Sequence, residues 1–245
     1  MIETAIILAA GKGERLTEIW ADKPKGFIQI GNLTLIERTI KILKQNHINR
    51  LLIITGYEAE YYETLSLNDD SITTIKNNNF ATTGNMASLV RANKYLSSDF
   101  FLIEADIVFE ERAISELQNT KQNDVILISQ FTHAGDEVYV DTSGLRVVKL
   151  SKKRAQIKNC TGELVGISKI SYNLFQKMVQ HYCQNPKKYC TIAYEDCLNK
   201  IMANTVVQFH KINDLLWGEI DTPNHFERIT KTIYPAIARK ESKVQ

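Results

Sequence analysis

The sequence predicts an α/β fold with a mixed, mostly parallel central sheet flanked by helices, and three observations support this prediction. In the first half, short apolar runs alternate with stretches of helical spacing, which is typical of βα units. In the second half, strand-like segments follow one another with turns between them, which predicts antiparallel strands in an insertion-like second half. No repeat and no linker rich in glycine, serine or proline divides residues 1–245, so we expect a single domain.

The first half is expected to alternate strands with helices. Ala5–Ala10 is a continuous apolar run, as expected for a central strand that is buried on both faces. Residues Leu35 to Leu43 keep helical spacing and lead into a strand at Arg50–Thr55. The other elements expected in this half are a strand at Ile72–Lys76, a helix capped by Asn85 and a strand at Phe100–Ile103.

The second half is expected to consist of strands with two helices inserted between them. The predicted strands are Val125–Phe131, Glu137–Asp141, Leu145–Leu150, Leu164–Ile170, Thr205–Ile212 and Leu216–Ile220, with a turn at Asp141–Gly144. The predicted helices are Tyr172–Gln184 and Tyr194–Met202, with Pro186 between them. Thr222 and Pro223 fit a helix N-cap and first helical position, so Asp221 lies between a strand end and a helix start.

The composition is that of a globular protein, with 44% hydrophobic and 24% charged residues. At this length a folded chain buries roughly three quarters of the surface that its unfolded form exposes, so neither disulfides nor a structural metal are needed. Thirty Lys and Arg against 28 Asp and Glu give a formal charge of +2. This charge is too small to predict non-specific binding to nucleic acid or to a membrane surface.

The sequence predicts a cytoplasmic protein with no membrane insertion. Its apolar runs are far shorter than the ~20 residues of a membrane-spanning helix, and its first residues lack the basic start of a secretory signal. Cys160, Cys183, Cys190 and Cys197 do not have the close spacing of zinc ligands, since the last three are spaced by seven. We therefore expect reduced thiols.

The most informative motif directly follows the first strand, where residues 8–16 read LAAGKGERL, and residues 23–26 then read KPKG. Glycines at the carboxyl end of a strand let backbone N–H groups approach a phosphate, and flanking cations neutralise its charge. A dinucleotide-binding loop would need glycine in place of Leu16, and a P-loop would need Ser or Thr in place of Gly13. The motif predicts a nucleotide-binding loop of another kind. An ordinary glycine-rich turn is the alternative, but it would leave Arg15 and Lys25 unexplained.

These motifs resemble those of the nucleotidyltransferases that include sugar-1-phosphate pyrophosphorylases and cytidylyltransferases. In that family the pattern LAAGxGxRL and a later Pro-Lys stand as they do here, at residues 8–16 and at Pro24-Lys25. The family also has an Asp after a middle strand and another near the end, which match Asp106 and Asp221. The resemblance covers nearly the whole chain and implies a Rossmann-like nucleotidyltransferase fold.

Asp106 and Asp221 are the metal ligands that the resemblance implies. Both follow predicted strands, and two carboxylates together with substrate phosphates suit octahedral Mg²⁺. For either residue alone, a helix cap or a turn is the alternative. Glu104 lies two residues before Asp106 and shares its strand face if the strand continues.

A closer resemblance is to the cytidylyltransferases that activate small amine-bearing phosphonates or phosphates. It is carried by segments at residues 25–30, 83–86, 135–139, 162–167 and 194–196, and is strongest to enzymes acting on 2-aminoethylphosphonate and next to those acting on phosphocholine. It implies CMP transfer from CTP with release of pyrophosphate, catalysed with the help of Arg15, Lys25 and Lys152. The nucleotide-binding residues that it implies are Leu8, Ala9, Ala10, Gly11, Lys12, Gly13, Gly84, Asn85 and Glu104.

The residues expected to bind the amine are carboxylates and aromatic rings. Carboxylates accept hydrogen bonds from an ammonium, and aromatic faces attract it through cation–π contacts. The alternative is that the acids are solvated loop charges and the rings belong to the core. The substrate-binding candidates are Asp136, Glu137, Tyr139, Tyr194, Glu195 and Trp217.

Three other functions compete with this interpretation. A sugar-1-phosphate nucleotidyltransferase needs hydroxyl-binding side chains in place of an ammonium pocket. A nucleotide-sugar glycosyltransferase would use Glu104 and Asp106 as a metal motif but leaves Arg15 and Lys25 unexplained, and a nucleotide-sensing module would bind CTP without turnover. A homodimer is compatible with the sequence, which does not predict the oligomeric state.

Overall fold

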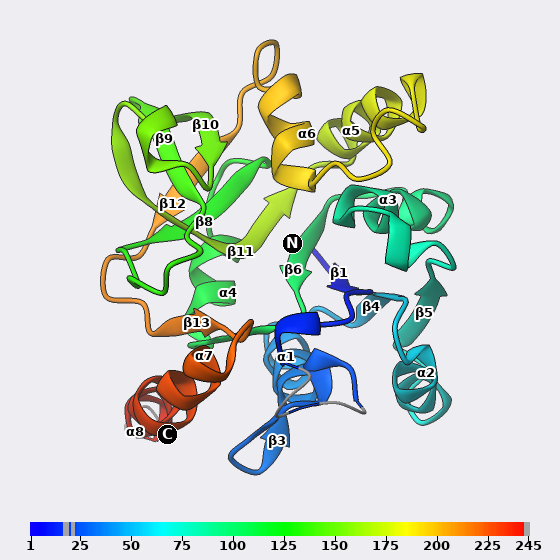
Figure 1. The fold of residues 1–245 in the computed structure, drawn as a ribbon, viewed down its shortest axis with the longest axis vertical. Helices are drawn as coiled ribbons and strands as arrows, with labels where there is room; N and C mark the ends of the chain where they lie inside the picture. Colours follow the sequence, from blue (N-terminus) through cyan, green and yellow to red (C-terminus); the bar gives the residue numbers. More distant parts are fainter. Residues whose placement is uncertain (17–19, 21–22, 243–245) are drawn as a thin grey trace.

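Nine strands form one mixed sheet in the computed structural model, which describes residues 1–16, 20 and 23–242. Their order is β5-β4-β1-β6-β11-β8-β12-β10-β9, and the first four lie on one side of the molecule in Figure 1. These four strands are parallel, so their carboxyl ends meet at one edge: β1 (Thr4–Ala9), β4 (Arg50–Thr55), β5 (Ile72–Lys76) and β6 (Phe100–Glu104).

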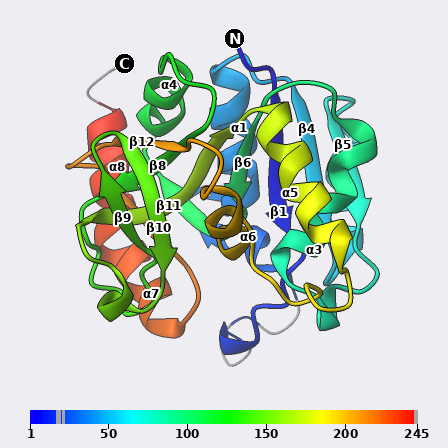
Figure 2. The ribbon, with the colours of Figure 1, turned by 90° about the horizontal axis from the view of Figure 1, so that it is seen from above.

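Helices cover both faces of the parallel strands because side chains alternate along each strand. In β1, Ala5 and Ile7 face one apolar core, whereas Ile6 faces a second. The first core includes residues of α1 (Leu35–Gln45), α2 (Ala59–Leu67) and α4 (Arg112–Gln118). The second includes residues of α3 (Asn85–Val90), α5 (Tyr172–Gln184) and α6 (Tyr194–Ile201). Figure 2 shows α5 and α6 on one side of the sheet and α1 on the other.

The strands of the second half close into a ring because β11 pairs with two different strands along one of its edges. The pairs in this ring are antiparallel except for β8 with β12, which are parallel. Along one edge β11 pairs with β8, and along the other Glu163 pairs with Tyr139 of β9, whereas Ile167 pairs with Ile103 of β6. β9 also connects back to β8 through β10 and β12. The sheet opens between β6 and β9, where β11 changes partner. The bounds of the ring strands are β8 (Val125–Ser129), β9 (Tyr139–Ser143), β10 (Arg146–Ser151), β11 (Cys160–Ile170) and β12 (Gln208–Lys211).

Smaller elements complete the fold beside the sheet opening. β7 (Ile107–Phe109) and β13 (Trp217–Glu219) form an antiparallel ribbon, and β2 (Gln29–Ile30) pairs with β3 (Leu33–Thr34). Near the C-terminus, α7 (Pro223–Arg228) passes through a π-helical turn into α8 (Tyr234–Glu241). Apolar residues of these parts form a third core. Among the described residues, no helix has the length and apolar character required to cross a bilayer.

The predicted α/β architecture is confirmed, with corrections at several element ends. Gly84, not Asn85, is the N-cap of α3, and this helix ends at Val90 and continues as a 3-10 helix. β8 ends at Ser129, and β9 begins at Tyr139 and runs to Ser143. The predicted turn therefore moves to residues 144–145, where Gly144 has a φ of +58°. The strand predicted from Leu164 begins at Cys160, and the strands predicted at Thr205–Ile212 and Leu216–Ile220 shorten to β12 and β13.

The helix start predicted at Thr222 is confirmed. The Thr222 side chain accepts a hydrogen bond from the N–H of His225, and Pro223 is the first residue of α7. Two of the helices that the sequence analysis missed have weak signals: α2 buries only Ala59 and Tyr62, and α4 has seven residues. Such short or mostly exposed helices depend on tertiary packing more than on their own pattern.

Candidate active site

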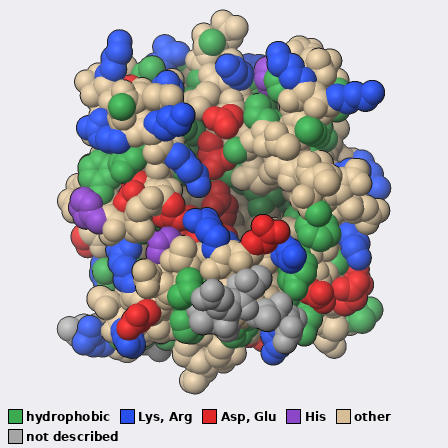
Figure 3. Space-filling model, in the orientation of Figure 1, with side chains coloured by type: hydrophobic (Ala, Val, Ile, Leu, Met, Phe, Trp, Pro, Cys, Tyr) green, Lys and Arg blue, Asp and Glu red, His purple; other side chains and the backbone are tan. Residues whose placement is uncertain are grey.

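A cleft of about 280 Å³, here called the central cleft, opens where β11 changes partner from β9 to β6. Its walls come from the ends of β1 and β6, the start of α3, the loop before β9, and β13. Figure 3 shows acidic side chains in the hollow at the centre of this face. The sequence-predicted site residues that line it are Leu8, Ala10, Gly11, Gly84, Asn85, Glu104, Asp106, Asp136, Glu137, Lys152, Glu195 and Trp217.

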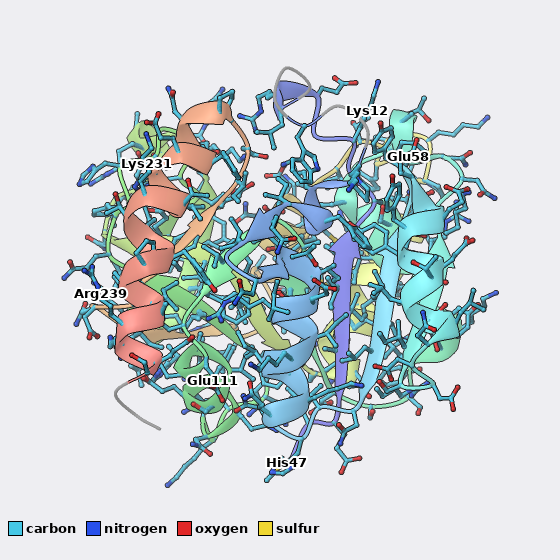
Figure 4. All side chains as sticks on the ribbon, turned by 90° about the horizontal axis from the view of Figure 1, so that it is seen from below. Lys12, His47, Glu58, Glu111, Lys231 and Arg239 are labelled. Atoms are coloured by element: carbon cyan, nitrogen blue, oxygen red, sulfur yellow. The ribbon has the colours of Figure 1, made fainter. Side chains whose placement is uncertain are left out.

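The glycine loop after β1 extends the central cleft into a smaller cavity of about 70 Å³. Ala9, Gly13 and Lys25 line this cavity, which shares Asp106 with the cleft. Gly13 has a φ of +67°, and a Cβ atom there would lie 2.9 Å from the Lys25 side chain. Glycine at this position therefore lets the lysine pass close to the loop. Lys12 is exposed at this end of the sheet (Figure 4) and lines neither space.

Asp106 and Asp221 are brought together by the ribbon of β7 and β13. β7 begins directly after Asp106, and β13 ends two residues before Asp221. The strands are antiparallel, with Glu219 opposite Ile107, and the N–H of Ile220 donates to the carbonyl oxygen of Asp106 at 2.9 Å. The ribbon therefore fixes the relative position of two carboxylates that lie far apart in the sequence.

Lys25 lies between these two carboxylates. Its ammonium donates to Oδ2 of Asp106 at 2.8 Å and also pairs with Asp221, and Arg15 pairs with the second oxygen of Asp221. Burial alone would lower the pKa of Lys25, but the two carboxylates raise it above its ordinary value. Burial alone would raise the pKa of Asp221, but Lys25, a hydrogen bond from Glu219 and Arg15 together lower it to about 2. The predicted catalytic cations thus contact the predicted metal ligands.

Glu219 is a site residue that the sequence analysis did not select. Its carboxylate lies in a group with Glu104 and Asp106, and in another with Asp136 and Asp221; within each group the oxygens lie within 4.8 Å of one another. Burial and the neighbouring carboxylates raise the pKa of Glu219 to about 11, so it is protonated and donates to Asp221. A signal was present in the sequence, because the spacing Glu-x-Asp occurs both at residues 104–106 and at 219–221.

Glu104 is held at the end of β6 by two features of its surroundings. The hydroxyl of Tyr194 donates to Oε1 of Glu104 at 2.8 Å. On the other side, Gly166 of β11 has a φ of +80°, and a Cβ atom there would lie 3.2 Å from the Glu104 carboxyl carbon. Burial, Glu195 and Asp106 raise the pKa of Glu104 to about 8.

Gly84 and Asn85 link the nucleotide side of the central cleft to α6. The N–H of Gly84 donates to the carbonyl of Cys190 at 2.8 Å, and a Cβ atom at Gly84 would lie 2.4 Å from the carbonyl oxygen of Ile192. Oδ1 of Asn85 accepts from the N–H of Tyr194 at 2.7 Å, in the first turn of α6. The segment therefore has a packing role as well as a place in the cleft wall.

The loop before β9 brings acidic groups to the opposite wall. Oδ2 of Asp136 is buried without a hydrogen-bond partner among the described residues and lies 3.9 Å from Nδ1 of His225. Nε2 of that histidine is 3.1 Å from the carbonyl of Ala134, so His225 supports the loop. Glu137 instead accepts from the N–H of Gly135 and from the Tyr139 hydroxyl. Of the two adjacent acids, Asp136 has the oxygen that is free for a ligand.

The predicted aromatic residues are not brought together. Trp217 lines the central cleft, and its buried Nε1 has no hydrogen-bond partner among the described residues. Tyr194 is buried at 1% exposure and holds Glu104, and Tyr139 lies outside the cleft lining. Glu195 lines the cleft, and its Oε2 is likewise buried and unpartnered in the described part of the chain.

Glu163 and Lys152 are two further ionisable residues, one acidic and one basic, that line the central cleft. Thr132 donates to Glu163 from its N–H at 2.7 Å and from its hydroxyl at 2.9 Å. Burial raises the pKa of Glu163 to about 7. Lys152 follows β10 and lowers the pKa of Glu195, against the raising effect of burial. Glu163 was missed because its burial results from the pairing of β11, which the sequence does not show.

A family model described as a MobA-like NTP transferase domain matches residues 5–201. The chain belongs to this family. The match covers the glycine loop, Lys25, Asp106 and the loop before β9. It confirms the sequence-based prediction of a nucleotidyltransferase family.

This MobA-like NTP transferase is 24% identical, over 223 residues, to the 2-aminoethylphosphonate cytidylyltransferase of Lancefieldella rimae, with 89% of this chain and 88% of the relative covered. It also matches bifunctional GlmU proteins of Methanococcus species at 24 or 25% identity, and it spans about half of their length. The sequence match confirms that this chain is similar to a cytidylyltransferase that is named for an amine-bearing substrate.

Solved structures confirm the fold of this MobA-like NTP transferase. The inositol-1-phosphate CTP transferase from T. maritima superimposes with a TM-score of 0.82 at 21% identity, covering 97% of this chain and 96% of that one. The CTP:phosphocholine cytidylyltransferase from Streptococcus pneumoniae gives a TM-score of 0.78 at 21% identity, with 94% and 99% covered. The predicted Rossmann-like nucleotidyltransferase fold is correct.

The carboxylates of this MobA-like NTP transferase have the chemistry of a divalent-cation site. Hard cations such as Mg²⁺ prefer carboxylate oxygens, and the two groups of such oxygens share Glu219. Asp106 belongs to one group and Asp221 to the other, so a ligand set drawn from both groups is within reach. The buried oxygen of Asp136, which has no hydrogen-bond partner within the described residues, adds a further donor beside Asp221.

Proposed function

We propose that this protein is a cytidylyltransferase that transfers CMP from CTP to a small amine-bearing phosphonate or phosphate and releases pyrophosphate. 2-Aminoethylphosphonate is its proposed substrate, and the cytoplasm, where CTP is made, its proposed location. The family and the names of the relatives support a nucleotidyltransferase that uses CTP. The observation that carries the proposal is the layout of the central cleft. A glycine loop and cations lie at one end of the cleft, and at the other end lie buried carboxylate oxygens that have no hydrogen-bond partner among the described residues.

The nucleotide end of the cleft suits a triphosphate. The backbone of Gly11–Gly13 follows a parallel strand, where backbone N–H groups approach phosphates in α/β folds. Lys25 and Arg15 supply two cations at the same place. When CTP binds, its phosphate oxygens compete with Asp221 for both cations. Placing them on the triphosphate neutralises the charge that develops on the departing pyrophosphate.

The substrate's own oxyanion is the nucleophile in this reaction. It attacks the α-phosphorus of CTP in line, a new P–O bond forms, and the bond between the α-phosphorus and the bridging oxygen breaks. The electron pair leaves with pyrophosphate. Lys152 follows β10 and lines the cleft, and it would orient the anionic group of the substrate. No protein nucleophile is required, and catalysis consists of positioning and charge neutralisation.

Mg²⁺ is the proposed cofactor. Asp106 and Asp221 would hold it, with Glu104 or Glu219 as additional oxygen donors. When bound, the metal would polarise the phosphoryl oxygens of the nucleotide and shield the charge between nucleotide and nucleophile.

A primary ammonium is favoured over trimethylammonium by the groups that line the cleft. A primary ammonium donates three hydrogen bonds, whereas trimethylammonium donates none and is held mainly by aromatic faces. Of the three aromatic residues considered, only Trp217 lines the cleft. Asp136 and Glu195 each have a buried oxygen that finds no hydrogen-bond partner in the described part of the chain. The cleft thus offers more carboxylate oxygens than aromatic faces to a cation, which supports 2-aminoethylphosphonate as the substrate ahead of phosphocholine and of sugar 1-phosphates.

Pyrophosphate release with CTP and Mg²⁺ tests the proposal. The acceptors to compare are 2-aminoethylphosphonate, phosphoethanolamine, phosphocholine, inositol 1-phosphate and glucose 1-phosphate, and ATP, GTP and UTP serve as donor controls. We expect release only with CTP, and the highest kcat/KM with 2-aminoethylphosphonate. Preference for a sugar 1-phosphate would overturn the assigned acceptor, and CTP binding without turnover for any acceptor would overturn the assigned activity.

A further inference from the structure

A second groove, of about 840 Å³, lies behind the nucleotide side of the central cleft. It is bounded by β5, by α3 with the 3-10 turn after it, and by the end of α5 with the loop that follows. All the charged side chains in its lining are basic, and we call it the basic groove. They are Lys76, Arg91, Lys94 and Lys187.

The positive charge of the basic groove comes from two long segments of the sequence that lack acidic residues. Residues 71–98 and 171–194 contain no Asp or Glu and together contain six Lys or Arg. The whole chain is nearly neutral at +2, so positive charge is concentrated on this surface. The central cleft has the opposite character, because most of its charged lining is acidic. A concave surface lined by one sign of charge raises the local concentration of counter-ions, here anions.

The cations of the basic groove are available to a ligand. Arg91, Lys94 and Lys187 are exposed and form no ion pair within the described residues, and Lys76 has only a long contact of 3.4 Å with the exposed Glu60. The Lys94 ammonium lies over the Tyr95 ring at 4.9 Å. Tyr95 and Tyr182 also line the groove, so it offers aromatic surface next to its cations.

The basic groove and the central cleft share a wall. Thr83 lines both spaces. Cys190 lines the groove, and its carbonyl accepts the hydrogen bond of Gly84, which lines the cleft. Gly84 also has no room to move toward the 191–192 backbone, because even a Cβ atom would lie 2.4 Å from the Ile192 oxygen. A ligand that shifts the loop at Cys190 must therefore shift Gly84.

We propose that the basic groove binds a phosphorylated small molecule, a nucleoside phosphate in particular, as an effector of the nucleotide site. Arg91, Lys94 and Lys187 would bind the phosphates, and Tyr95 or Tyr182 would contact the base. The groove's volume lies within the range of about 300–1,000 Å³ that small-molecule sites have. A nucleic acid would need an extended basic stripe, and the low net charge of the chain argues against one. Ligand binding in the groove is independent of the proposed reaction, since it concerns a different surface, whereas the effector role rests on the proposed function.

The first test measures binding without catalysis. ATP is titrated calorimetrically, in the presence of a chelator, into the wild-type protein and into a variant carrying R91Q, K94Q and K187Q. A matched control carries K41Q, K121Q and K158Q, which remove the same charge from exposed positions outside the groove. We expect the groove variant to bind ATP at least about tenfold more weakly and the control to bind as wild type does. Thermal melts verify that all three proteins are folded.

Different results of these measurements would overturn the binding site, the class of ligand or the effector role. Equal affinity in the wild type and the groove variant, no binding at all, or equal losses in both variants would overturn the site. Tighter, groove-dependent binding of a single-stranded oligonucleotide would overturn the ligand class.

In the second test, ATP is added to the pyrophosphate assay. A change of about fivefold or more in the KM for CTP is expected in the wild type but not in the groove variant. Groove-dependent binding with unchanged kinetics would overturn the effector role alone, and an inactive enzyme would count against the proposed function and not against the groove.

Discussion

Nζ of Lys25 lies 2.8 Å from Oδ2 of Asp106, so a cation assigned to the triphosphate contacts a carboxylate assigned to the metal. The two side chains are only 14% and 20% exposed, which strengthens their attraction by excluding solvent. A metal held by Asp106, as proposed, would therefore compete with Lys25 for the same oxygens. Binding of the triphosphate would remove this competition, because it would offer Lys25 other anionic oxygens and free the carboxylates. The proposed order is that metal enters fully only with the nucleotide.

Replacing Lys25 with alanine should separate metal binding from catalysis. The variant should bind Mn²⁺ about tenfold or more tightly without nucleotide, because the competing ammonium is gone. Its turnover should fall on the order of 10²-fold, by analogy with the loss of other groups that stabilise transition-state charge. Mn²⁺ binding by electron paramagnetic resonance and pyrophosphate release measure the two effects.

Stability offers a second measurement on the same variant. Lys25→Ala removes the cation that contacts Asp106 and one of the two cations that contact Asp221, since Arg15 still pairs with Asp221. Removing one partner of a buried ion pair costs about 3–5 kcal/mol, and the partial exposure of Asp106 and the remaining Arg15 pair place the expected loss at or below the lower end of this range. Added Mg²⁺ should restore much of the loss in Tm, since it replaces the missing positive charge. Lys23→Ala, at an exposed lysine of the same segment, is the control and should change neither Tm nor metal affinity. Weaker Mn²⁺ binding by Lys25→Ala would contradict the competition between lysine and metal.

Glu219→Gln tests the carboxylate that belongs to both oxygen groups. Glutamine is neutral, as is the protonated Glu219, and it can still donate to Asp221. The free energy of unfolding in the absence of metal should therefore change by less than about 1 kcal/mol. Mg²⁺ affinity should fall if Glu219 gives up its proton to become a ligand. Asp106→Asn and Asp221→Asn are the comparison, and both should lose nearly all turnover. Unchanged metal affinity in Glu219→Gln would exclude this residue from the ligand set.

Glu163 should make stability depend on pH near neutrality. Its pKa in the folded protein is raised from 4.5 to about 7, so between these values the folded state holds a proton that the unfolded state has lost. The free energy of unfolding therefore falls as pH rises through this window, by about 3 kcal/mol at about 1.4 kcal/mol per unit. Glu163→Gln stays neutral and should lack this part of the decline. Urea unfolding at several pH values in the window measures the difference, and parallel curves for both proteins would refute the assignment.

Much of the parallel half of the fold was predictable, because its signals are local. The strands at Arg50–Thr55, which contains the apolar run Leu51–Ile54, and at Ile72–Lys76 were predicted with the correct ends. The glycine loop and Asp106 also follow strands that local patterns identify. In the ribbon, β13 lies within the strand predicted at Leu216–Ile220, whereas β7 was missed, because a three-residue strand has no usable periodicity.

The site residues that sequence reasoning missed depend on tertiary structure. Glu163 is buried because β11 pairs with β8 and β9 at that point, and Glu219 is protonated because other carboxylates surround it. Tyr194 was expected beside the substrate, but α6 packs it into the core, where its hydroxyl holds Glu104. The residue types and the motif spacing indicated which residues to consider. They did not indicate which way a side chain on α6 would face.

Asp136 should determine the preference for a primary ammonium. Its Oδ2 is buried without a hydrogen-bond partner among the described residues, whereas the neighbouring Glu137 already accepts hydrogen bonds from Gly135 of its own loop and from Tyr139 of β9. Removing one charge-assisted hydrogen bond from such a pocket costs roughly 1.5–3 kcal/mol, or about one to two powers of ten in selectivity. Asp136→Asn should therefore lower kcat/KM for 2-aminoethylphosphonate by this factor and change that for phosphocholine much less. Asp196→Asn removes the same charge from an exposed position on α6 and is the control. Equal losses for both substrates would mean that Asp136 supports the loop or the metal, and a wild-type preference for phosphocholine would mean that Trp217 is the main contact of the cation.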